Sequence, residues 1–192
     1  MARQSPNVID LYHGAVDAMS PTLSAVRADQ LTAATPCTDW NVQNLITHNI
    51  KIADFVLGII LGNNTTNHFE VGEPLPAQGG REAFTAGTVK VLELLKSGNI
   101  DRVMETPFGT MPLSSFIMFP TLDIVIHQWD LSKGIGANAA VDAGLVEARY
   151  GALQMGAEGG QAQGAFAAEV IVPISATIQD KLLALSGRTP SF

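Results

Sequence analysis

Apolar side chains recur along this chain at spacings of three and four residues, the pattern of helices that bury one face. Stretches with this pattern are predicted as helices at residues 7–29, 41–62, 81–96, 112–136, 142–155 and 177–186. Pro21 is expected to bend or divide the first helix, and Pro120 to kink the fourth. Asn41 is expected to cap the start of the second helix, and Gly62 to end it.

The segments between these helices are rich in Pro, Gly, Asn and Thr, which is typical of loops. Residues 32–40 are predicted as an ordered connection, and residues 63–80 as a long loop of the kind that often borders a functional site. The Pro-Phe-Gly step at residues 107–109 predicts a turn. Residues 156–164 hold many glycines and are expected to be flexible, and residues 169–173 to form a short strand or an extended segment.

Composition narrows the class of protein. A length of 192 residues with 46% hydrophobic residues suits a single domain, residues 1–192. The net charge is −7 and the 11 Lys and Arg residues are scattered, so no nucleic acid partner is expected. The most apolar stretch, residues 52–61, is interrupted by Asp54 and is too short to span a bilayer, so no membrane is expected. The lone Cys37 cannot form an internal disulfide, which fits the cytoplasm.

Candidate chemistry is concentrated in the helical segment around residues 123–130. Side chains four residues apart lie on one helix face, displaced by about 6 Å along the axis, so Asp123 and His127 can converge on one ion. A metal site needs a further ligand, and His48 on the second helix is the best candidate. From spacing alone, a core histidine paired with a carboxylate explains Asp123 and His127 equally well. Asp130 is expected to orient an imidazole or to make a structural hydrogen bond.

Other residues are weaker candidates. Trp40 and Trp129 are candidates to line a pocket, although large aromatic side chains beside helix ends are more often core anchors. Cys37 has no neighbouring cation in the sequence that would activate its thiol, so a packing role is expected. His13 and His68 are expected on the surface.

Two segments resemble the signatures of a known family. Residues 35–48, TPCTDWNVQNLITH, and residues 123–131, DIVIHQWDL, resemble segments of the DinB-like metal-binding superfamily. More narrowly, the chain resembles proteins related to the N-terminal domain of mycothiol-dependent maleylpyruvate isomerase, with their P-C-x-x-W, L-x-x-H and H-x-W-D-L signatures. Residues 180–188 are similar to the close of the smaller members. The resemblance implies an all-α fold, an up-down-down-up four-helix bundle with a short extended segment and small helices at the C-terminus.

The same resemblance implies a divalent metal bound by His48, Asp123 and His127. The isomerase usually has Glu where this chain has Asp123. Zn is the first expectation for these ligand types, and Ni, Mn, Co and Fe are also compatible.

The resemblance further implies a low-molecular-weight thiol such as mycothiol, bound through the metal, whose thiolate attacks a small electrophile. The leading hypothesis is therefore a metal-dependent thiol S-transferase or isomerase with a small-molecule substrate. A metal-dependent hydrolase and a non-catalytic metal-binding or stress-response module are the alternatives. A homodimer through an apolar helix face is also open.

Overall fold

The computed structural model describes residues 7–162 and 167–191 and is mainly helical, so the predicted all-α class is confirmed. Its elements in chain order are α1 (Val8–Ser24), the 3₁₀ helix η1 (Ala28–Gln30), α2 (Val42–Leu61), α3 (Gly80–Ser97), β1 (Val103–Thr106), β2 (Gly109–Pro112), α4 (Leu113–Phe116), α5 (Met118–Gly134), α6 (Ala143–Ala162) and α7 (Ile178–Leu185).

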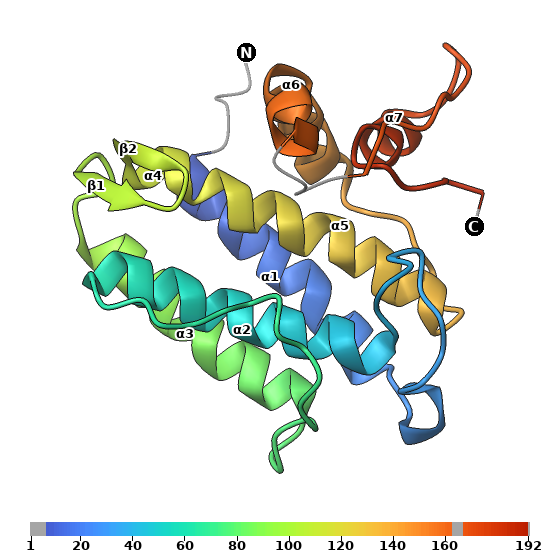
Figure 1. Cartoon of the computed structure of the whole chain (residues 1–192), viewed down its shortest axis with the longest axis horizontal. Helices are drawn as coiled ribbons and strands as arrows, with labels where there is room; N and C mark the ends of the chain where they lie inside the picture. The colour runs from blue at the N-terminus through green and yellow to red at the C-terminus, as the bar shows by residue number, and fades with distance from the viewer. Residues whose placement is uncertain (1–6, 163–166, 192) are drawn as a thin grey trace.

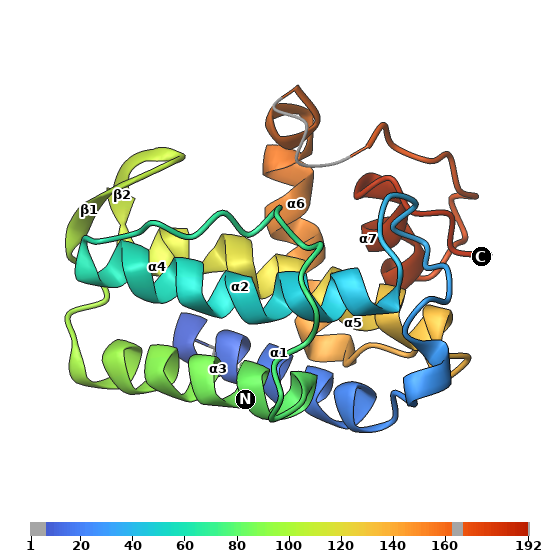
Figure 2. The same cartoon turned by 60° about the horizontal axis from the view of Figure 1, so that its bottom comes forward.

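The four long helices α1, α2, α3 and α5 form a bundle (Figure 1). Helices α1 and α2 each pack against both α3 and α5, which closes the ring. The colour gradient shows α1 and α5 running in one direction and α2 and α3 in the other, the up-down-down-up order that the resemblance implied. Helices α6 and α7 pack against each other beside this bundle, and the β1–β2 hairpin lies at one of its ends (Figure 2).

Helix α2 begins and ends where the sequence predicts. The Asn41 side chain accepts a hydrogen bond from the Asn44 backbone N–H at 2.9 Å and so caps the helix. Gly62 ends it in the left-handed region at a φ of 71°, where a residue without a Cβ is favoured. These two signals fix the length of the helix that carries His48.

The two prolines interrupt the chain differently from the prediction. Helix α1 ends at Ser24, shortly after Pro21, and η1 follows instead of a helix continuing to residue 29. The break in the fourth predicted helix lies at Ile117, between α4 and α5, and not at Pro120. Pro120 is in the first turn of α5, where a missing N–H removes no intrahelical hydrogen bond.

The remaining differences lie in the hairpin and the C-terminal part. The turn at residues 107–109 is correct, but it joins two short antiparallel strands, paired from Val103↔Pro112 to Thr106↔Gly109. Four residues are too few for an alternating pattern to be recognised. Helix α6 continues through residue 162, so the predicted helix end at residue 155 is wrong. The flexibility expected at residues 156–162 stays a prediction, and residues 163 and 164 lie outside the described part. Residues 169–173 are extended chain, the second of the predicted alternatives.

By length and composition alone, α2 could cross a membrane. Its most apolar 18-residue window has a mean hydropathy of 1.3, but 61% of that window is buried inside the structure. Core helices of water-soluble bundles show the same properties, so this is weak support for a membrane span. The expectation of no membrane partner stays a prediction.

The close packing of α2 on α3 can be tested with two helical glycines. A Cβ added at Gly87 on α3 would lie 2.8 Å from the Ala53 Cβ on α2, whereas one at Gly151 on α6 would meet nothing within 4 Å. Alanine is favoured over glycine in a helix by up to about 1 kcal/mol, and overpacking costs about 1–3 kcal/mol. Gly151→Ala is therefore expected to raise the free energy of unfolding in urea, and Gly87→Ala to lower it. Equal effects at the two positions would contradict this packing.

Candidate metal centre

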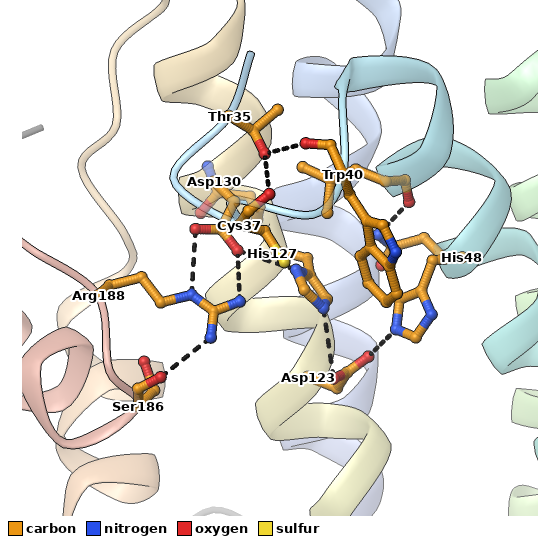
Figure 3. Close-up of polar contacts among 12 residues, drawn as sticks. Thr35, Cys37, Trp40, His48, Asp123, His127, Asp130, Ser186 and Arg188 are labelled. Atoms are coloured by element: carbon orange, nitrogen blue, oxygen red, sulfur yellow. Dashed lines mark hydrogen bonds and ion pairs between the residues drawn. The ribbon is translucent and has the colours of Figure 1, made fainter. Parts of the chain in front are cut away.

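His48 from α2 meets Asp123 and His127 from α5 between the two helices (Figure 3). The Nε2 atom of His48 lies 2.9 Å from Asp123 Oδ2, and Nε2 of His127 lies 3.5 Å from Asp123 Oδ1. The ligand atoms of the three residues lie within 4.8 Å of one another. Because metal–ligand bonds to N and O are about 2 Å long, one ion can reach all three. We call these three residues the candidate metal centre.

The hydrogen bond on the far side of the His48 ring fixes its tautomer. Nδ1 lies 2.7 Å from the backbone oxygen of His68. A carbonyl oxygen only accepts, so Nδ1 must carry a proton and donate it. In a neutral imidazole, Nε2 then presents a lone pair to the Asp123 carboxylate, which is itself an acceptor. A proton or a metal ion between these two atoms removes the repulsion, so this contact favours a cation between them.

His127 is fixed in the same way. Its Nδ1 lies 2.9 Å from Oδ2 of Asp130, a carboxylate whose side chain is fully buried. The ionised carboxylate accepts, so Nδ1 donates and Nε2 is again the free ligand atom, aimed at Asp123. The structure therefore places Asp130 where an imidazole-orienting residue must lie. Asp130 in turn accepts hydrogen bonds from Arg188, a residue that the sequence analysis did not single out.

The charges of the metal-free centre are strongly coupled. Burial raises the pKa of Asp123, but His127 and His48 outweigh burial and hold that pKa well below its usual range. Burial lowers the pKa of His127, but Asp123 and Asp130 outweigh it and raise the pKa to about 9. Without a metal, the carboxylate therefore stays ionised and His127 carries a proton on both ring nitrogens at neutral pH.

Trp40 forms one wall of the candidate metal centre. Its ring lies 4.4 Å from the His48 ring and 5.6 Å from the His127 ring, measured between centroids. The turn before it is held by the buried Thr35, whose hydroxyl donates to the backbone oxygens of Cys37 and Trp40. The Thr-Pro-Cys sequence thus forms a rigid turn that brings an aromatic ring against both imidazoles.

The other candidates occupy different places. Trp129 is buried, with the Lys133 ammonium 5.8 Å from its ring centroid, and its place in a pocket wall stays a prediction. Cys37 lies within reach of His127 and Asp130, but burial raises the pKa of its thiol to about 11, which fits an unreactive side chain.

The two remaining histidines differ from each other. His13 is exposed and lies 3.6 Å from Asp17, as expected for a surface residue. His68 lies in the loop as expected but is half-buried, and its ring centroid lies 4.5 Å from Phe55 and 5.6 Å from His48. Burial, followed by the field of His48, lowers the pKa of His68 to about 4 and keeps its ring neutral. The sequence feature that could have indicated His68 as a site residue is its place in the long loop, residues 63–80, of a kind that often borders a functional site.

The chain was compared with known proteins. A family model described as the mycothiol maleylpyruvate isomerase N-terminal domain matches residues 12–132, which include the whole candidate metal centre. Two uncharacterized proteins, from two strains of Mycobacterium tuberculosis, are each 30% identical to this chain over 185 residues, covering 93% of this chain and 96% of the relative.

Two solved structures have the same fold. They are crystal structures of the mycothiol-dependent maleylpyruvate isomerase and of its histidine-to-alanine mutant, with TM-scores of 0.54 and 0.59 and 15% and 16% identity. Each alignment covers 76% of this chain and 68% of the other. At such low identity the likeness is one of fold.

The raised pKa of His127 predicts how stability of the metal-free protein depends on pH. A group whose pKa rises from 6.5 to about 9 on folding stabilises the fold fully below pH 6.5 and progressively less as the pH approaches 9. In urea unfolding with a chelator present, the free energy of unfolding is therefore expected to fall over this window, and His127→Gln to remove most of the fall. A wild-type slope unchanged by the substitution would contradict the assignment.

Proposed function

The chain belongs to the family of the mycothiol maleylpyruvate isomerase N-terminal domain, and from this premise we propose that it is a metal-dependent enzyme using a low-molecular-weight thiol. The reaction is S-transfer to, or isomerisation of, a small electrophile. One observation carries the proposal. Hydrogen bonds on Nδ1 leave the Nε2 atoms of His48 and His127 as the ligand atoms, and both are aimed at one carboxylate.

The donor set fits a divalent ion. Two imidazole nitrogens and one carboxylate oxygen are the ligands of many catalytic zinc sites, and they also suit Ni, Co, Mn and Fe. An ion held there supplies Lewis acidity, which favours the ionised form of a thiol at neutral pH. Asp123 neutralises part of the ion's charge, while His68 and Asp130 keep both imidazoles in the ligand tautomer.

One side of the candidate metal centre is open. The side chains of His48 and His127 are 2% and 6% exposed, whereas that of Asp123 is 30% exposed. This exposed carboxylate is the side from which a thiol and a substrate would approach. Three protein ligands with an accessible fourth position are typical of catalytic sites, and structural sites are usually closed. This exposure favours an enzyme over a module with a structural metal.

The family favours thiol chemistry over hydrolysis. The same three protein ligands could activate water. The hydrolase alternative therefore differs only in the fourth ligand of the ion, which would be water and not a thiol. Mycothiol appears in the description of the family, and we therefore take a mycothiol-like thiol as the co-substrate of this chain. The electrophile is a small molecule of unspecified identity.

Metal content should depend on the buried His48 and His127 and not on the exposed His13. His13 is the matched control, because it pairs with Asp17 at the same four-residue spacing but on the surface. Protein purified without an affinity tag is expected to hold near-stoichiometric metal by mass spectrometry in the wild type and in His13→Ala. His48→Ala and His127→Ala are expected to lose it while keeping their circular dichroism. Metal retained by both of the latter variants would exclude this ligand set.

Thiol use is tested on protein reloaded with Co²⁺. Adding mycothiol, or another small thiol, is expected to produce a thiolate-to-cobalt charge-transfer absorption, and turnover of a model electrophile should require the thiol. The spectrum should not change on adding the corresponding thioether, which has no proton to lose. Ester hydrolysis without any thiol, and no thiol-induced absorption, would instead support the hydrolase.

A further inference from the structure

The turn after α7 brings an arginine toward the bundle. The Gly187 N–H donates to the Ala184 oxygen at 3.0 Å, and the Arg188 N–H donates to the Leu183 oxygen at 2.9 Å. These two bonds define a Schellman motif, the common helix ending with glycine in the left-handed region. Gly187 has a φ of 80°, and a Cβ there would lie 2.6 Å from the Ala167 Cβ. Only glycine fits, so the direction in which Arg188 leaves the helix is fixed.

The Arg188 side chain donates two hydrogen bonds to the Asp130 carboxylate. Nη2 lies 2.9 Å from Oδ2 and Nε lies 3.3 Å from Oδ1, while Nη1 donates to the Ser186 backbone oxygen at 3.0 Å. The Asp130 side chain is fully buried and that of Arg188 is 11% exposed. A two-point contact of this kind holds the carboxylate plane in one orientation, and the positive guanidinium also compensates the negative charge of the carboxylate.

One oxygen joins this ion pair to the candidate metal centre. Oδ2 of Asp130 accepts from Arg188 Nη2 and from His127 Nδ1, each at 2.9 Å (Figure 3). We propose that Arg188 is a positioning residue for the metal: through Asp130 it holds the His127 proton on Nδ1 and aims Nε2 at the ion. This inference rests on the proposed metal-dependent function. It assigns a role to a residue that lies outside residues 12–132, the part matched by the family model.

The physical reason is the cost of a buried carboxylate. Without the guanidinium, the buried Asp130 carboxylate would lose two of the three hydrogen bonds that it accepts from His127 and Arg188, and it would be free to rotate or to shift. In either case His127 loses a fixed acceptor, and its ring can adopt the other tautomer or turn away from Asp123. Residues that hold metal-binding imidazoles in this indirect way typically contribute about 10–100-fold to metal affinity.

The test is the Zn²⁺ dissociation constant, measured by competition with a chromophoric chelator. Arg188→Met is expected to weaken binding by about 10–100-fold, and Arg188→Lys by less, since an ammonium keeps the charge but not the two-point contact. In an Asp130→Asn background, Arg188→Met should change affinity by no more than about twofold, because its effect passes through the carboxylate. Arg102→Met is the control. This arginine donates to the Ile60 oxygen, about 18 Å along α2 from His48, and its loss should leave affinity unchanged.

Wild-type affinity in Arg188→Met, or an equal loss in the Asp130→Asn background, would overturn the proposal. A second readout works on metal-free protein and is independent of function. The His127 Nδ1–H proton should give a solvent-protected NMR signal in the wild type that is lost in Arg188→Met, and its persistence would also overturn the proposal. A wild type that takes up no metal counts against the proposed function, whereas a wild type that binds metal but uses no thiol leaves the role of Arg188 intact.

Discussion

Each imidazole of the candidate metal centre donates a hydrogen bond from Nδ1 on the side of the ring away from Asp123. These two hydrogen bonds are the constraint on which the geometry of the site depends. Because the His68 backbone oxygen and the Asp130 carboxylate accept hydrogen bonds from the two Nδ1 atoms, both Nε2 atoms face the Asp123 carboxylate, an arrangement that a cation between them stabilises. Adjacent packing of α2 and α5 brings His48 to Asp123, which is 75 residues away in sequence. The four-helix bundle thus acts mainly as a rigid frame for three side chains.

Burial, and not spacing, distinguishes this centre from an ordinary surface pair. His13 and Asp17 have the same four-residue spacing as Asp123 and His127, yet their side chains are 48% and 69% exposed. Solvent screens that surface pair and leaves its geometry loose. At the buried centre solvent screens the charges less, so Asp123 stays ionised and the pKa of His127 is raised to about 9. The Asp123 carboxylate is the most exposed of the three side chains.

The sequence predicts the helices and the ligand set better than their surroundings. Asn41 and Gly62 act through contacts within a few residues, so the limits of α2 can be recognised from local sequence. The short hairpin has no period long enough to detect. His68 contacts His48 from 20 residues away and Arg188 contacts Asp130 from 58 residues away, and neither carries a local pattern that identifies its partner. The glycine before Arg188 predicts a helix end, but not where the next side chain points.

The central claim is that one cation is shared by His48, Asp123 and His127. The most direct measurement is anomalous diffraction at the metal absorption edge, on crystals of protein purified without chelator and soaked in Zn²⁺. If the three residues share one cation, the anomalous map is expected to show a single strong peak about 2 Å from the Nε2 atoms of both histidines and from a carboxylate oxygen of Asp123. Density without a peak there, with both imidazoles still hydrogen-bonded to Asp123, would contradict it and leave the three residues as a buried proton-sharing cluster.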